Sequence, residues 1–158
     1  MPIVSAENQF KQGLVALVDR NYVEAAMHFR RAMDIEHQRR ILNPDMRYLS
    51  YYGMCRATAH DKIQEGLHAC KHAARVRSLD PEMFLNLGRV YLLARQKRLA
   101  YDAFQTGLDL DPQHPTLISE SKHLLKQAGV RPKPAPTPRG GLFSRVRSAW
   151  SRPSPSPR

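Results

Sequence analysis

The residues in this sequence best suited to chemistry are two histidines and a cysteine in the run HACKH. His68 and His72 are four residues apart, which places both imidazoles on one face of a helix, and Cys70 lies between them in the sequence. Imidazole and thiolate are the groups that zinc binds most often in proteins. We nevertheless interpret the two histidines as part of a solvated face and not as metal ligands.

No other catalytic or metal-binding pattern is evident. Cys55 and Cys70 form no CxxC or CxxCH motif, which fits buried thiols in a reducing compartment. The sequence also has no nucleophile elbow, no glycine-rich phosphate loop and no HExxH motif. We therefore expect a protein that is not an enzyme, and we predict no cofactor and no metal. An activity that is lost when His68 or His72 is changed would contradict this expectation.

The basic charge is concentrated toward the C-terminal end. The formal net charge is +11, and residues 131–158 contain seven basic residues and no acid. Positions 1–130 then hold 18 basic against 14 acidic residues, a balance of +4. The start of the sequence has neither a basic leader nor an apolar run, and no stretch approaches the roughly 20 apolar residues of a membrane-spanning helix. We expect a cytoplasmic protein.

The elements that must position any functional residue are helices. Between Ser5 and about Gly129, apolar residues recur at helical spacing and no strand pattern is present. Ser5 is the expected N-cap of the first helix, while Asn43 and Asp80, each followed by proline, are expected to start later helices. Pro115 repeats this signal, and Gly129 is expected to cap the last helix. The sequence thus predicts three helical hairpins and one final helix.

The three predicted hairpins are copies of one pattern. Gly13, Gly53 and Gly88 take matching places in the first helix of each hairpin, at intervals of 40 and 35 residues. A period in this range indicates stacked helical units. Small residues followed by a bulky one recur in each second helix, as expected where two helices pack closely. We attribute the longer first interval to an extra turn or two within AMDIEHQRRILN.

These residues give the sequence a resemblance to the tetratricopeptide-repeat family. Residues 81–112 match the family's spacing most fully, residues 6–38 form a second copy, and residues 46–81 a degenerate one. The matching positions are Phe84, Leu87, Gly88, Tyr91, Ala100, Phe104, Gly107 and Pro112; Gly13, Tyr22, Ala25, Phe29 and Ala32; and Tyr52, Gly53, Gly66, Cys70, Ala73 and Asp80. The resemblance implies an all-α helical-hairpin solenoid over residues 1–129, with a capping helix over about 115–128. It also implies that Cys70 is buried while His68 and His72 project outward.

The resemblance further implies a protein-binding scaffold with a groove lined by the first helix of each hairpin. Carried over position by position, the groove residues are Phe10, Leu14 and Leu17; Arg47, Ser50, Met54 and Ala57; and Leu85, Arg89 and Leu92. Members that hold a C-terminal carboxylate have Lys and Asn where this chain has Phe10 and Leu14, so that clamp is expected to be missing. An apolar groove with two arginines would suit an amphipathic helix or a peptide segment with apolar anchors and an acid or two. The alternative is that part of this stripe packs against the final helix or against a second copy in a homo-oligomer.

The composition changes after Gly129. Residues 130–141 form a proline-rich linker, expected to be extended, and residues 153–158 are expected to be a disordered end. Between them, residues 142–152 read as a basic amphipathic segment with apolar residues at helical spacing. The expected anchor residues of this segment are Leu142, Phe143, Arg145, Val146, Arg147 and Trp150.

The basic amphipathic segment has several interpretations. It is similar in type to the short C-terminal membrane-targeting helices of some bacterial cell-division proteins, and it would place its apolar face in an anionic membrane surface. It would also fit a partner's groove or the chain's own groove, or remain an unstructured solubilising tail. Nucleic-acid binding has little support, because the sequence predicts no recognition fold.

The combined pattern favours a non-enzymatic adaptor. The repeat groove would bind a segment of a partner protein, and the C-terminal segment would place the complex at the inner face of a membrane. The alternative is a small soluble repeat chaperone for a secretion or assembly client, which has no evident need of the basic tail.

Overall fold

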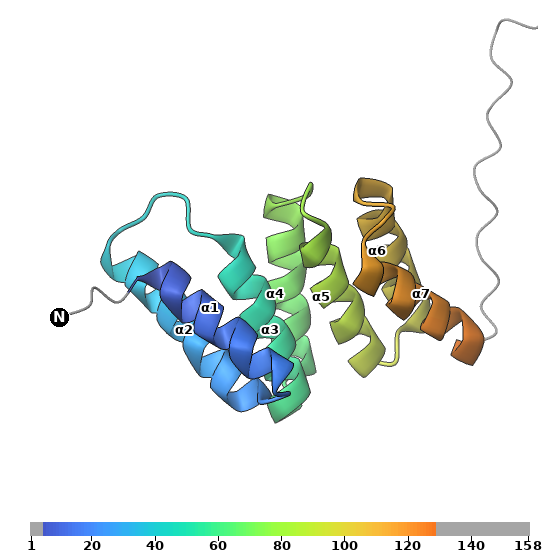
Figure 1. Cartoon of the computed structure of the whole chain (residues 1–158), viewed down its shortest axis with the longest axis horizontal. Helices are drawn as coiled ribbons and strands as arrows, with labels where there is room; N and C mark the ends of the chain where they lie inside the picture. Colours follow the sequence, from blue (N-terminus) through green and yellow to red (C-terminus); the bar gives the residue numbers. More distant parts are fainter. Residues whose placement is uncertain (1–4, 129–158) are drawn as a thin grey trace, which may run out of the picture.

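The computed structural model describes residues 5–128, and every regular element in this range is an α-helix (Figure 1). The all-α helical-hairpin architecture expected from the sequence is confirmed. The helices are α1 (Ala6–Val18), α2 (Tyr22–Gln38), α3 (Met46–His60), α4 (Ile63–Val76), α5 (Pro81–Leu93), α6 (Lys97–Leu110) and α7 (Pro115–Ala128).

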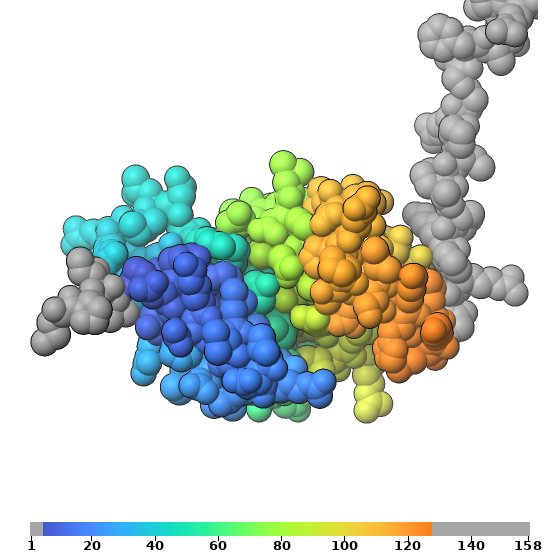
Figure 2. Space-filling model, in the orientation of Figure 1, coloured from blue at the N-terminus to red at the C-terminus, as the bar shows by residue number. Residues whose placement is uncertain are grey.

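Consecutive helices form hairpins that stack along the long axis of the molecule (Figure 1). The closest helix pairs are α1 with α2, α3 with α4, and α5 with α6, while α2–α3 and α4–α5 contacts join one hairpin to the next. The last helix, α7, packs on α6. The space-filling view shows the result as one continuous body (Figure 2).

Short polar side chains fix most of the helix starts. The Ser5 side chain accepts the Asn8 N–H, and the Asp80 side chain accepts the Glu82 N–H directly before Pro81, both as expected from the sequence. The expected start at Asn43 was wrong, because α3 begins at Met46. Asp45 takes the capping place there and accepts the Arg47 N–H at 2.9 Å. The positive end of the helix dipole stabilises a carboxylate more than a neutral amide, which favours Asp45 over Asn43 as the cap.

The first repeat is longer than the others. The α2 helix has 17 residues, whereas α4 and α6, its equivalents in the other hairpins, have 14 each. This extra length, with the loop over residues 39–45 that follows, accounts for the 40-residue interval in the sequence.

Close approach of two helices explains the recurring glycines. A Cβ atom at Gly88 would overlap the ring of Phe104, and one at Gly13 would overlap the ring of Phe29. Both rings are fully buried. In these two hairpins the first helix therefore lies directly on an aromatic ring of the second, and only glycine leaves room for it.

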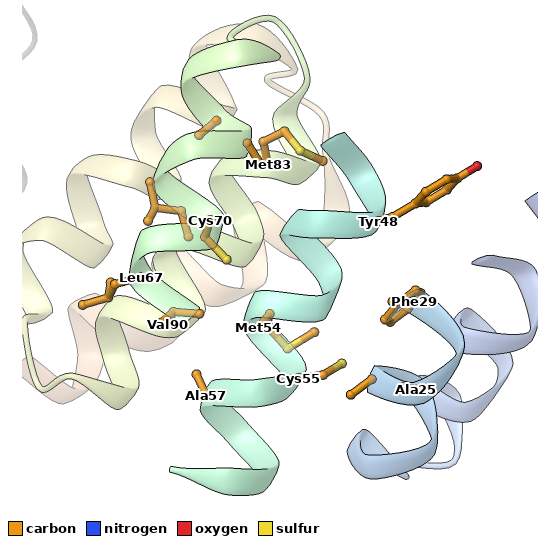
Figure 3. Packing of buried hydrophobic residues seen from close by; sticks show 14 of the residues in the cluster. Ala25, Phe29, Tyr48, Met54, Cys55, Ala57, Leu67, Cys70, Met83 and Val90 are labelled. Atoms are coloured by element: carbon orange, nitrogen blue, oxygen red, sulfur yellow. The ribbon is translucent and has the colours of Figure 1, made fainter. Parts of the chain in front are cut away.

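The middle hairpin packs without such a ring. A Cβ atom at Gly53 would lie 2.7 Å from Ala69 Cβ and 3.4 Å from Cys70 Sγ. Figure 3 shows α3 between α2, which contributes Ala25 and Phe29, and α4 and α5, which contribute Cys70 and Val90. In this hairpin, small side chains take the place that the aromatic ring holds in its neighbours.

Candidate partner-binding face

The first helices of the hairpins lie side by side and form one surface together with α7. We call the surface formed by α1, α3, α5 and α7 the first-helix face. Phe10 of α1 contacts Tyr48 and Tyr51 of α3, with ring centroids 5.2 and 5.4 Å apart. The Asn86 Nδ2 group of α5 donates to Ser50 Oγ of α3 at 3.2 Å. Further polar contacts join α5 to α7.

Each first helix contributes one stripe to this face. Residues separated by three, four and seven positions share a side of a helix, and the same four levels recur in each hairpin. From the N-terminal to the C-terminal end, the stripes are Glu7, Phe10, Leu14 and Leu17 with Val18; Arg47, Ser50, Met54 and Ala57 with Thr58; and Glu82, Leu85, Arg89 and Leu92 with Leu93.

Charged groups fill the N-terminal half of the face between α1 and α3. Arg47 Nη2 lies 3.1 Å from Glu7 Oε2 and 2.6 Å from Asp45 Oδ2, and the Arg47 guanidinium carbon lies 4.8 Å from the centroid of the Phe10 ring. Asp45 also accepts from Arg77 at 2.9 Å. Partial burial opposes ionisation of Asp45, but the hydrogen bonds and positive charges of Arg47 and Arg77 outweigh it and lower the pKa of Asp45. Arg47 is therefore engaged within the domain.

A second polar network continues the charged half from α3 to α7. The Tyr51 hydroxyl donates to Glu82 Oε2 at 2.9 Å, and Glu82 Oε1 lies 2.9 Å from His114 Nε2. Burial, followed by the Glu82 charge, raises the pKa of Tyr51. His114 Nδ1 accepts the Leu117 N–H at 3.3 Å, so the same imidazole caps α7. The two contacts fit the tautomer with its proton on Nε2.

The second predicted groove arginine is engaged as well. Arg89 Nε donates to Glu120 Oε1 of α7 at 3.0 Å, with both side chains partly exposed. The sequence predicted Arg47 and Arg89 as the two basic groove residues for an acidic ligand. Each already forms an ion pair with a carboxylate of this chain. A ligand acid would have to displace that carboxylate.

Apart from Arg89, which shares the level of Leu14 and pairs with Glu120, the C-terminal half of the face is apolar and accessible. Leu14 and Leu17 of α1 and Leu92 of α5 are half-buried. Next to them, Val18 is 82% exposed and Leu93 is 40% exposed. We call these five residues the apolar half of the first-helix face.

The remaining predicted groove residues are placed inside the domain. Phe10, Ser50, Met54, Ala57 and Leu85 are all buried. Phe10, Met54 and Ala57 belong to one hydrophobic core and Leu85 to the other, while Ser50 accepts a hydrogen bond from Asn86, so all five support the face from below. The predicted groove positions with accessible surface are Leu14, Leu17, Arg47, Arg89 and Leu92, and their role toward a partner stays a prediction.

Sequence reasoning missed two exposed apolar residues and the acids that pair with the arginines. Val18 and Leu93 follow Leu14 and Arg89 by four residues, a spacing that could have placed them on the same helix side. The pairing of Glu120 with Arg89 had no signal in the sequence, because the two residues are 31 positions apart.

The HACKH run adds no metal site to this face. His68 is exposed, and His72 Nδ1 lies 3.2 Å from Arg75 Nη2, while Cys70 is fully buried. Burial raises the pKa of both Cys55 and Cys70 to about 12, so neither thiol ionises near neutral pH. Within residues 5–128, histidine, cysteine and acidic side chains form no group of three that could hold a metal ion.

Two surface hollows lie away from the predicted groove stripes. The first, of about 410 Å³, is lined by Gln9, Arg31, Asp34, Ile35 and Gln38, and the second, of about 370 Å³, lies over residues 76–81. No helix in the described part of the chain has the length and apolarity needed to cross a bilayer. The linker, the basic amphipathic segment and the C-terminal end, residues 130–158, lie outside the described residues.

Known structures with the same arrangement of helices are tetratricopeptide-repeat domains. The Arabidopsis OM64 TPR domain superposes with a TM-score of 0.60 at 17% identity, covering 77% of this chain and 94% of that one. The first TPR of Spaghetti (RPAP3), bound to the HSP90 peptide SRMEEVD, gives 0.62 at 13% identity, covering 80% and 97%. PcrH from Pseudomonas aeruginosa gives 0.60 at 15% identity, covering 82% and 100%.

The sequence comparisons add no closer relationship. No protein-family model matches the sequence, and the comparison with curated proteins gives no match. The structural likeness is therefore a likeness of fold. The chain has the tetratricopeptide-repeat fold, as the spacing of its glycines, alanines and aromatic residues indicated.

Proposed function

We propose that this chain is a non-enzymatic protein-binding module that receives an amphipathic helix across the apolar half of its first-helix face. The observation that carries the proposal is the pair of accessible apolar ridges on α1 and α5. Leu14, Leu17 and Val18 form one ridge, and Leu92 and Leu93 form the other. Exposed apolar surface on a folded domain is a common mark of a binding site.

The geometry favours a helical ligand of modest length. Axes of neighbouring packed helices are about 8 to 10 Å apart, and α3 lies between α1 and α5. Because α1 meets α3 through long aromatic side chains, the two ridges are at least about 20 Å apart, which is the length of about 13 helical residues. A helix with apolar residues at i, i+3, i+4 and i+7 presents such a stripe.

The charges favour an apolar ligand over an acidic chain end. Arg47 already holds Glu7 and Asp45, and Arg89 holds Glu120. The similar domain of RPAP3 was solved with the acidic peptide SRMEEVD, but in this chain Phe10 and Leu14 stand where carboxylate-binding relatives have Lys and Asn. Burial of leucine and valine side chains would supply most of the binding energy instead.

A peptide selection tests the proposal. A library of helical peptides of about 13 residues, varied at their apolar positions, is selected against the wild-type protein, and the best binders are measured by titration calorimetry. The variant Val18→Glu with Leu93→Glu should weaken binding by at least about tenfold, because two buried apolar contacts become charged. Both side chains are exposed, so the fold should be unchanged.

The matched control is Val23→Glu with Leu99→Glu. It adds the same charge at two other exposed apolar positions, 48% and 45% exposed, that lie on second helices. The control should bind the selected peptides as the wild type does. Peptides that bind the Val18→Glu, Leu93→Glu variant as tightly as the wild type would place the binding site elsewhere.

The placement of the complex in the cell is a separate part of the proposal. The basic amphipathic segment 142–152 would hold an adaptor at an anionic membrane, whereas a soluble chaperone would act without it. Trp150→Glu separates the two, because an adaptor loses its membrane association with this change while a chaperone retains its function.

A further inference from the structure

A second exposed apolar surface lies on the loops that join the hairpins. Leu42, in the loop between α2 and α3, is 94% exposed, and Leu79, in the loop between α4 and α5, is 83% exposed. Ile41 and Val76, beside them in the chain, are also exposed. We call these four residues, together with Arg40 and Arg75 that precede Ile41 and Val76, the loop edge. No feature of the tetratricopeptide packing requires leucines at these places.

An ion pair joins the end of one loop to the start of the other. Arg77, directly after α4, donates to Asp45, at the end of the α2–α3 loop, at 2.9 Å. Arg77 also lies 3.4 Å from Asp80. Figure 1 shows both loops on the same side of the molecule, and Figure 2 shows both protruding from the body there. The Asp45–Arg77 ion pair therefore fixes the bases of the two loops relative to each other, and the loops protrude separately along the same side.

The exposed charge of the loop edge is positive. Arg40 is exposed beside Ile41, and Arg75, whose Nη2 lies 3.2 Å from His72 Nδ1, is exposed beside Val76. The nearby acids are engaged within the domain: Glu36 Oε2 accepts the Asp45 N–H, while Asp45 and Asp80 pair with Arg77. The loop edge thus exposes apolar and basic side chains, and neither loop has an exposed acid.

We propose that the loop edge docks on an anionic lipid surface. Leu42 and Leu79 would enter the boundary of the acyl chains, and the arginines would lie at the phosphates of the headgroups. This is the division of roles that interfacial segments use. Each arginine near an anionic leaflet raises the partition coefficient about fivefold, so the edge needs negatively charged lipid.

Other occupants fit the same residues less well. A second copy of the chain would bring arginines against arginines if the two edges met face to face. Nucleic acid is bound through bases stacked on aromatic rings or through polar contacts, whereas the tips here are aliphatic. A protein partner would need a hollow that accepts both leucines and acids that accept the arginines, and it is an outcome of the test.

The membrane contact proposed above for residues 142–152 would act together with the loop edge. Residues 142–152 combine apolar residues and arginines in the same way. Two weak membrane contacts on one chain would strengthen each other, because the second would form within an already bound molecule. The loop edge is a different surface from the apolar half of the first-helix face, so this proposal stands or falls separately from the proposed function.

Vesicle flotation of the full-length protein tests the loop edge. Vesicles of pure phosphatidylcholine and vesicles with added phosphatidylserine are compared at physiological salt. The wild-type protein should float only with the anionic vesicles. Leu42→Glu with Leu79→Glu should lower the partition coefficient at least about tenfold, while Val23→Glu with Leu99→Glu, which adds the same charge elsewhere, should leave it nearly unchanged.

Several results would overturn the proposal. They are no flotation of the wild type, equal flotation with neutral vesicles, or an equal loss in both double variants. Flotation that is lost with Trp150→Glu but unchanged with Leu42→Glu and Leu79→Glu would assign the membrane contact to segment 142–152 alone. Binding of polyglutamate that depends on Leu42 and Leu79, without vesicle binding, would indicate an acidic protein partner instead.

Discussion

Arg89 of α5 and Glu120 of α7 form an ion pair, with the guanidinium Nε donating to the carboxylate at 3.0 Å. The pair ties the last helix to the third hairpin across the first-helix face. It also occupies one of the two arginines that this face would otherwise offer to an acidic ligand. The face therefore combines open apolar side chains near the C-terminal ends of α1 and α5 with charged side chains that are already paired within the domain.

The engaged arginines predict weak binding of acidic chain ends. The peptide SRMEEVD should bind the wild-type protein with a dissociation constant above about 1 mM, which corresponds to about 4 kcal/mol. Glu120→Gln leaves Arg89 without its carboxylate and should strengthen binding of this peptide a few-fold. Fluorescence anisotropy of a labelled peptide measures both values. Glu65→Gln, which removes an acid paired with Arg56 away from this face, is the control and should have no effect.

Gly88 should tolerate no side chain. A Cβ atom there overlaps the Phe104 ring, so Gly88→Ala should lower the free energy of unfolding by about 1 to 3 kcal/mol, and Gly88→Leu by more. Combining Gly88→Ala with Phe104→Leu should cost less than the sum of the two single changes, because the smaller side chain leaves room for the methyl group. Urea denaturation measures all variants. Additive costs would mean that the two residues do not share this contact.

The turn after α5 carries a removable strain. Arg95 has a positive φ of 59°, a conformation that favours glycine. Arg95→Gly should raise the free energy of unfolding by about 0.5 kcal/mol, since relief of the left-handed conformation exceeds the entropy that glycine adds to the unfolded chain. Arg98→Gly, within the first turn of α6, should instead lower it by up to about 1 kcal/mol. Thermal unfolding of both variants shows whether each change raises or lowers stability. A loss of stability with Arg95→Gly would contradict the predicted strain at this turn.

The lowered pKa of Asp45 predicts that the free energy of unfolding falls at acid pH. The pKa of Asp45 is lowered in the folded protein, so its contribution is present above the ordinary pKa near 3.9 and is lost as the pH falls through the folded-state value. Asp45→Asn should therefore reduce the free energy of unfolding at pH 7, and the difference from wild type should shrink below about pH 4. Urea denaturation at pH 7, 5 and 3 measures this. A difference that is constant across these pH values would show that the Asp45 charge does not contribute.

The sequence predicted the fold because its signals are local. The Gly88 and Phe104 spacing, the Asp80 cap before Pro81 and the polar residues between helices each act within one hairpin. The start of α3 was misplaced because two capping residues, Asn43 and Asp45, lie two positions apart, and the bonds from Arg47 and Arg77 that favour Asp45 depend on the folded arrangement.

The candidate site was harder to predict because it depends on contacts between hairpins. Ser50 and Leu85 lie on the expected stripe, but Ser50 is buried where α5 packs on α3, and Leu85 is buried in the core that α5 forms with α6 and α7. No local pattern in the sequence predicts these contacts. The pairing of Arg47 with Glu7 joins residues 40 positions apart. Leu42 and Leu79 fall in loops, where apolar periodicity gives no signal.

The central claim is that an amphipathic helix binds the apolar half of the first-helix face, and methyl NMR tests it most directly. The methyl groups of leucine and valine are labelled, and a peptide selected against the wild-type protein is titrated into the sample. The methyl signals of five residues should shift together and fit one dissociation constant: Leu14, Leu17, Val18, Leu92 and Leu93. The signals of Leu42 and Leu79 should stay unchanged. Shifts confined to other leucines and valines, with these five unmoved, would contradict the claim.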